Sequence, residues 1–124
     1  MANPNIVSVA SIYGKTVYDT DVATSAASLV SNAASSGKIL KINSLIIANI
    51  DGSASADITV TLRNAAGSST YSTLASTIAV PNDATLVVIS KDTAIYLEED
   101  MSLYVLASAA GDLSATCSYE EISE

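Results

Sequence analysis

Short stretches in which apolar and polar residues alternate, each ending at turn-forming residues, recur through the whole of this 124-residue chain. The clearest is the stretch 57–63, where Ile58, Val60 and Leu62 occupy every second position. Because successive side chains of a strand point to opposite faces of a sheet, this pattern predicts a strand with one buried face. The same period returns in residues 112–120, so Cys117 is expected on the buried face there.

Further strands are expected between turn signals along the rest of the chain. They are residues 6–13, closed by Gly14, and residues 21–32, 38–50, 71–80, 85–90, 94–97 and 103–108. Residues 21–32 also fit a short helix, but their serine and threonine content favours a strand. Asp51-Gly52 is a turn signal, which predicts a hairpin between 38–50 and 57–63. About eight short strands predict one all-β domain over residues 1–124, an antiparallel β-sandwich of jelly-roll type.

Residues 38–50 are apolar in both phases of the strand period. One phase holds Leu40, Ile42, Ile46, Ala48 and Ile50, and the other holds Ile39, Leu45 and Ile47. An antiparallel sandwich buries only one face of each sheet, so the second set is expected to meet a covering loop, a terminal arm or another subunit. Residues 1–5 are polar and contain a proline, which predicts a flexible N-terminal arm.

The composition excludes several kinds of chemistry. The chain has no histidine and a single cysteine, so Ser-His-Asp and Cys-His catalysis and an intrachain disulfide are all excluded. No glycine-rich phosphate loop and no zinc-type cysteine spacing occur, so neither an enzyme nor a cofactor is predicted. The net charge of −8 repels nucleic acids and anionic membranes. The start of the chain lacks the pattern of a signal peptide, and a soluble protein is expected.

Two acidic groups leave a binding function open. Asp19 with Asp21, and the run 98–100, place carboxylates in expected turns, where calcium takes its oxygen ligands. Residues 19–23 fall short of the full Asp-x-Asp-x-Asp-Gly spacing. The chain has neither tryptophan nor phenylalanine to stack a sugar ring. A calcium-dependent carbohydrate-binding module remains an alternative.

Four stretches together resemble small virion structural proteins of tailed phages, notably those that infect marine cyanobacteria. They are residues 2–7, 36–52, 91–100 and 117–122. The resemblance implies a capsid decoration, or cement, protein that binds the major capsid protein on the outer face of the shell. It also implies assembly in the host cytoplasm and a place on the virion surface. A neck, tail or fibre protein is the alternative within the virion.

The interface residues expected for such a protein come from two regions. Pro4, Asn5 and Ile6 of the arm are assigned to contact with the shell. The surplus apolar residues Ile39, Leu45 and Ile47 are assigned to contact between subunits of a homo-oligomer, for which a trimer is favoured.

Overall fold

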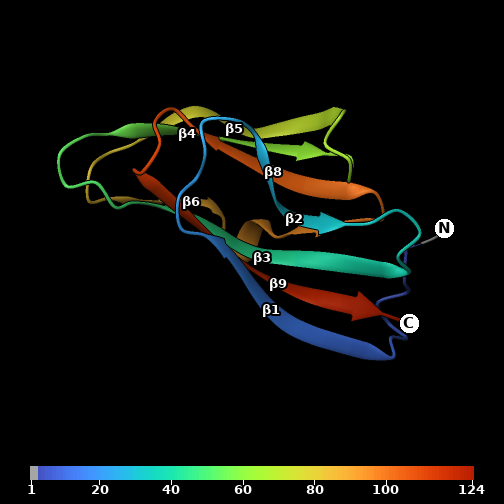
Figure 1. Ribbon diagram of the computed structural model, residues 1–124. Coiled ribbons are helices and arrows are strands. Elements are labelled where there is room, and N and C mark those ends of the chain that lie inside the picture. Colours follow the sequence, from blue (N-terminus) through green and yellow to red (C-terminus); the bar gives the residue numbers. More distant parts are fainter. Residues whose placement is uncertain (1–2) are drawn as a thin grey trace.

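The computed structural model describes residues 3–124 as two stacked antiparallel sheets (Figure 1). Sheet A contains β1 (Ser11–Asp19), β9 (Leu113–Ser123), β3 (Lys38–Asn49) and β6 (Thr85–Ile89) in that order, and β7 (Ile95–Leu97) also pairs with β3. Sheet B contains β2 (Ala27–Asn32), β8 (Met101–Ala107), β4 (Ala56–Arg63) and β5 (Thr70–Val80) in that order. A short 3-10 helix, η1 (Lys91–Thr93), links β6 to β7.

The strand pairing is nested, as in a long hairpin that has been rolled up. The first strand pairs with the last, β2 with β8, β3 with β6 and β7, and β4 with β5. Both strands of a pair lie in one sheet, and successive pairs alternate between sheet A and sheet B, which is the topology of a jelly roll. The predicted antiparallel β-sandwich of jelly-roll type is confirmed.

The connection between β3 and β4 differs from the expected hairpin. The two strands belong to different sheets, so the prediction of a hairpin at Asp51-Gly52 is wrong. The buried side chain of Asn49 holds this corner, because its Nδ2 donates hydrogen bonds to the carbonyl oxygens of Ala54 and Val80, each at 2.9 Å. A local turn signal thus marks a crossing from one sheet to the other.

The strand β3 changes phase in its middle. The register with β9 shifts between Ile42 and Ser44, which leaves Asn43 as an extra residue in a β-bulge. Before the bulge Leu40 and Ile42 point into the core, and after it Leu45 and Ile47 do so. Ile46 and Ile50, which were expected to share the buried phase of Leu40, are exposed.

Two other boundaries differ from the expected ones. β1 begins at Ser11 and passes through Gly14 to Asp19, whereas the expected strand ended before Gly14. In the stretch 21–32 only Ala27–Asn32 is a strand, and no helix forms there. Most residues of β1 are exposed on either face, although Val17 packs against the core, so the strand shows only a weak alternation of apolar and polar residues.

The core lies between the sheets and is built from aliphatic side chains. Ile42, Leu45, Ile58, Leu103 and Leu113 are among its fully buried members. Cys117 is buried with them, and this burial raises the pKa of its thiol to about 12. The described part of the chain contains no helix long and apolar enough to cross a membrane.

Candidate interaction surface

Large apolar side chains on the surface gather near the beginning of the chain. Within residues 3–124, five of the eleven exposed large hydrophobic residues lie between positions 6 and 18. They are Ile6 and Val7, which precede β1, and Ile12, Tyr13 and Tyr18 of β1, which we call the β1 surface. Ile12 and Tyr18 lie on the outer face of β1 and Tyr13 lies on its inner face, so exposed apolar side chains stand on both faces of this strand.

The strand β1 lies at the edge of sheet A. Its register with β9 is unbroken from Ser11, opposite Ser123, to Asp19, opposite Ala115. Among residues 3–124 no strand pairs with its other edge. An open edge of this kind offers unpaired N–H and C=O groups to another strand, and β1 contains no proline to block such pairing.

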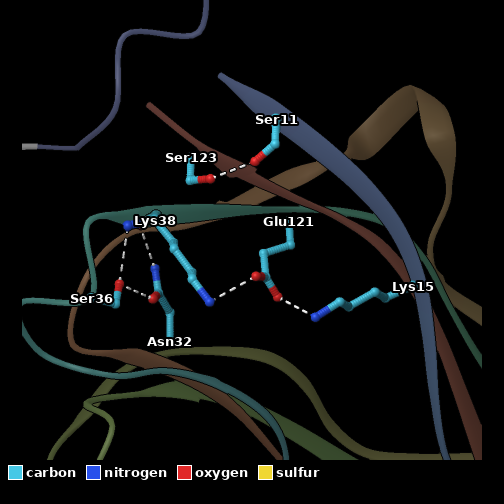
Figure 2. Close-up of polar contacts among 7 residues, drawn as sticks. All are labelled: Ser11, Lys15, Asn32, Ser36, Lys38, Glu121 and Ser123. Atoms are coloured by element: carbon cyan, nitrogen blue, oxygen red, sulfur yellow. Dashed lines mark hydrogen bonds and ion pairs between the residues drawn. The ribbon is translucent and has the colours of Figure 1, made fainter. Parts of the chain in front are cut away.

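An ion-pair network holds β1 against its neighbours on the inner face of sheet A. Figure 2 shows Glu121 between Lys15 and Lys38. The Lys15 ammonium lies 2.6 Å from Oε2 of Glu121 and the Lys38 ammonium lies 2.8 Å from Oε1. Hydrogen bonds from Lys15 and Lys38 lower the pKa of Glu121, so its carboxylate stays ionised at neutral pH. One side chain of β9 therefore links β1 to β3.

Hydrogen bonds at the same end of the sandwich complete this arrangement. The hydroxyl groups of Ser11 and Ser123 are 2.7 Å apart. At the corner between β2 and β3, the Ser36 hydroxyl donates to Oδ1 of Asn32, and Nδ2 of Asn32 donates to the carbonyl oxygen of Lys38 (Figure 2). The edge strand β1 is therefore joined to β9 by side-chain contacts at Ser11 and Lys15.

Residues 3–10, which we call the N-terminal strap, lie against the end of sheet A. Figure 1 shows the chain before β1 turning across the ends of β1, β9 and β3. At one end of the strap, Nδ2 of Asn3 donates to Oε1 of Glu98 at 2.6 Å, and the Glu99 N–H donates to Oδ1 of Asn3 at 3.4 Å. At its other end, the Ala10 N–H donates to the carbonyl oxygen of Ser123 at 2.9 Å.

An apolar pair lies on the outer face of sheet A at this end. Ile39 of β3 is opposite Ile122 of β9, and Ile122 is also opposite Ile12 of β1. Only 7% of Ile39 and 4% of Ile122 are exposed, although neither belongs to the core between the sheets. The strap crosses this end of the sheet and its Pro4 is buried. We call Ile39 and Ile122, at the end of the sheet that the strap crosses, the seat.

The six residues predicted for an interface occupy three different environments. Asn5 and Ile6 are exposed on the strap. Pro4 is buried within the strap, and Ile39 is buried in the seat. Leu45 and Ile47 are fully buried in the core, so they leave no apolar face free for a neighbouring subunit. The bulge at Asn43 is the reason, because it turns these two side chains inward.

The flexibility expected of residues 1–5 stays a prediction, and residues 1 and 2 lie outside the described part.

Sequence reasoning missed Ile12, Tyr13 and Tyr18. The strand containing them was expected to end before Gly14, and nothing in the local pattern indicates that β1 is an edge strand. Edge position depends on the order of strands in the sheet, which is set by residues far away in the chain.

The two acidic groups lie at opposite ends of the sandwich. Asp19 ends β1, and its Oδ1 accepts a hydrogen bond from the N–H of Asp21, whose own Oδ1 accepts one from the N–H of Gly111. The run 98–100 forms the turn between β7 and β8 beside Asn3. Among residues 3–124 no group of three or more histidine, cysteine, aspartate or glutamate side chains is arranged to hold a metal ion.

Comparison with known proteins gives fold likenesses at low sequence identity. No protein-family model matches the chain, and no curated protein matches it. A chain from Bacillus endospore appendages, described as a novel family of disulfide-linked pili, aligns with a TM-score of 0.53 and 14% identity, over 91% of this chain and 88% of that one. The VP2 subviral particle of infectious bursal disease virus aligns with a TM-score of 0.49 and 14% identity, over 94% of this chain and 34% of that one. The likeness to the appendage chain shows a shared β-sandwich fold.

Proposed function

We propose that this chain is a structural subunit that assembles with copies of itself, and that its specific role is that of a capsid decoration protein on a tailed phage. The observation that carries the proposal is the β1 surface: large apolar side chains on an open edge strand, which Glu121 of β9 holds by an ion pair to Lys15. Exposed apolar area beside unpaired backbone groups is stabilised when a second protein covers it.

The β-sandwich likeness to a pilus subunit is compatible with this role, but the linkage between subunits would differ. The endospore appendages are described as disulfide-linked. Cys117 is the chain's only cysteine and is fully buried, with its thiol pKa raised to about 12. Subunits of this protein would therefore associate without covalent links, through strand pairing and apolar contact.

A decoration protein also has to bind the shell. Asn5, Ile6 and Val7 of the strap are exposed, and 91% of Val7 is accessible to solvent. In this proposal these residues contact the major capsid protein, while β1 contacts other copies of the chain. Many weak contacts of this kind stabilise a shell together because each bound copy raises the effective concentration of the next.

Paired substitutions on two edge strands test the self-association. Tyr18 on β1 and Tyr71 on β5 are both exposed tyrosines, 70% and 51% respectively, and β5 is the edge of sheet B. We expect Tyr18→Lys to raise the dissociation constant of the oligomer at least tenfold in analytical ultracentrifugation, and Tyr71→Lys to leave it within about twofold. A wild-type chain that remains monomeric at all concentrations would contradict self-assembly.

The location in the virion needs a different measurement. Quantitative mass spectrometry of purified particles that contain this chain gives its copy number. Hundreds of copies per particle would support the shell, whereas about six or twelve would place the protein in the neck or tail and replace the decoration role.

A further inference from the structure

The outer strands of the two sheets differ in how well they can accept a further strand. They are β1, β6 and β7 in sheet A, and β2 and β5 in sheet B. β6 and β7 are short, β2 has a register shift against β8, and β5 contains an extra residue relative to β4 at each of three places. Short length and bulges are features that keep sheet edges from pairing. Among the edges within residues 3–124, β1 alone combines nine residues with an unbroken register.

The sequence of β1, SIYGKTVYD, has the same apolar pattern when it is read in either direction from Lys15. Ile12 and Tyr18 are each three positions from Lys15, and Tyr13 and Val17 are each two positions from it. The remaining positions of the strand hold glycine or polar residues. A strand with this symmetry is complementary to a second copy of itself in antiparallel orientation, because each apolar residue then meets an apolar residue.

We propose that two copies of the chain pair through β1 in antiparallel orientation, with Lys15 of each copy beside a two-fold axis. This inference rests on the proposed self-assembly and gives it a register and a symmetry. Ile12 lies opposite Tyr18 of the second copy, and Tyr13 lies opposite Val17. The two A sheets join into one continuous sheet across the axis. A two-fold contact closes at two copies, so this arrangement favours a dimer over the trimer predicted from the sequence.

Symmetry restricts the registers that are available. A two-fold axis perpendicular to the joined sheet keeps the inner faces of both copies on the same side, so one residue of each strand must pair with itself. An axis at Lys15 pairs all nine residues of β1. An axis at Gly14 would instead set Tyr13 opposite Lys15, and an axis at Thr16 would set Tyr13 opposite Asp19. Both alternatives place an exposed aromatic side chain against a charge, which disfavours them.

The charge of Lys15 is compatible with this position. Two lysines directly opposite each other would repel. The Lys15 ammonium, however, is 2.6 Å from Oε2 of Glu121, which belongs to β9 and so lies on the side of β1 away from the open edge. The ion pair neutralises the ammonium and directs it away from the second copy. The other charged residue of β1 is Asp19, so the strand carries no net charge, although the whole chain carries −8.

A cycle of charged variants tests the register in analytical ultracentrifugation. Ile12→Lys and Tyr18→Glu each place a charge against an apolar side chain of the second copy, and each should raise the dissociation constant at least tenfold. In the double variant the new ammonium of one copy lies opposite the new carboxylate of the other. We therefore expect the double variant to associate at least threefold more tightly than either single variant. The two positions are about 20 Å apart along one strand, so this recovery cannot arise within a chain.

The matched control makes the same charge changes on the edge of sheet B. Ile78 and Tyr71 of β5 are both exposed. Ile78→Lys, Tyr71→Glu and their combination should each change the dissociation constant less than about twofold. Circular dichroism checks that all variants remain folded. Additive effects of the two β1 substitutions, without recovery in the double variant, would overturn the proposed register.

Disulfide trapping measures the same pairing independently. Cys117 is fully buried and its thiol pKa is raised to about 12, so an introduced surface cysteine is the reactive thiol. We expect a mixture of Ile12→Cys and Tyr18→Cys chains to form a covalent heterodimer on mild oxidation, detected by intact-mass spectrometry. Neither variant alone should link, because its two copies of the cysteine are about 20 Å apart across the axis, whereas a disulfide needs Cα atoms within about 7 Å.

The outcomes separate this inference from the proposed function. If the wild-type chain forms an oligomer but the double variant shows no recovery, or the mixed cysteines do not link selectively, the β1 pairing is overturned and self-assembly stands. If the wild-type chain stays monomeric and no cysteine sample links, both fail.

Discussion

Ile42 and Leu45 point to the same face of β3, although three positions separate them and strict alternation would place them on opposite faces. The bulge at Asn43 accounts for this, because it inserts one residue into β3 where β9 has none. Both side chains are fully buried between the sheets. A single extra residue thus decides that Leu45 and Ile47, and not Ile46, face the core after the bulge.

Neighbouring substitutions after the bulge should differ sharply in their effect. Leu45→Ala removes a fully buried side chain and should lower the free energy of unfolding by about 2–5 kcal/mol. Ile46→Ala truncates a side chain on the outer face and should cost less than about 1 kcal/mol. Urea denaturation of both variants measures this difference. Equal losses would mean that the phase change at Asn43 does not occur in solution.

Two glycines with similar backbone angles allow the cost of a steric clash to be isolated. Gly67 and Gly111 have φ values of +79° and +82°, so alanine is strained at either position by about 1–2 kcal/mol. A Cβ at Gly67 would also overlap the Tyr104 hydroxyl, whereas none of the neighbouring atoms lies within 4 Å of a Cβ at Gly111. Arg63 lies over the Tyr104 ring, with its guanidinium carbon 4.9 Å from the ring centre, and restricts its movement. Gly67→Ala should therefore cost about 1–3 kcal/mol more than Gly111→Ala in thermal or urea unfolding.

Stability should depend on pH through Glu121. Hydrogen bonds from Lys15 and Lys38 hold its pKa below the ordinary value, so its contribution is present above that value and is lost as the pH falls through the lowered pKa. Glu121→Gln should destabilise the protein on the order of 1 kcal/mol at neutral pH. The difference between variant and wild type should disappear in acid. Urea denaturation from neutral to strongly acidic pH tests this, and a difference independent of pH would contradict the ion-pair network.

Asp112 should have the opposite effect. Its burial, followed by the neighbouring Asp51 carboxylate, raises its pKa, so folding favours the protonated form. The ionised side chain therefore destabilises the protein above the raised pKa, and this penalty vanishes as the pH falls below the ordinary value. Asp112→Asn should raise the melting temperature at neutral pH. Asp92→Asn, which removes the same charge from the exposed helix η1, is the control for the general effect of net charge. An equal rise in both variants would contradict a specific role for Asp112.

Local pattern was sufficient to predict the class of fold and most of the strands. In β4 the alternation of Ile58 and Val60 matches their burial, and in β9 that of Ala115 and Cys117 does so as well. These strands lie inside their sheets, with one face on the core and polar residues on the other. Under those conditions the alternation of a strand is a direct consequence of its geometry.

The candidate surface could not be predicted in the same way. Ile39 was predicted to be surplus to one buried face, and it is buried outside the core between the sheets. Leu45 and Ile47 were placed with it because nothing in residues 38–50 marks Asn43 as the site of a bulge. The exposure of Tyr18 depends on β1 having no second neighbour, which a local pattern does not record.

The amino-acid sequence by itself determined that this protein forms short strands with aliphatic inner faces, because strand periodicity and turn chemistry act between residues close together in the chain. Only the tertiary structure decided which strands pair, where β3 changes phase, which strand is left at the edge and where the strap lies. These features depend on contacts between distant segments, such as β1 with β9 and Asn3 with Glu98. Their free energy comes from the packing of the whole sandwich, so no single stretch of sequence encodes them.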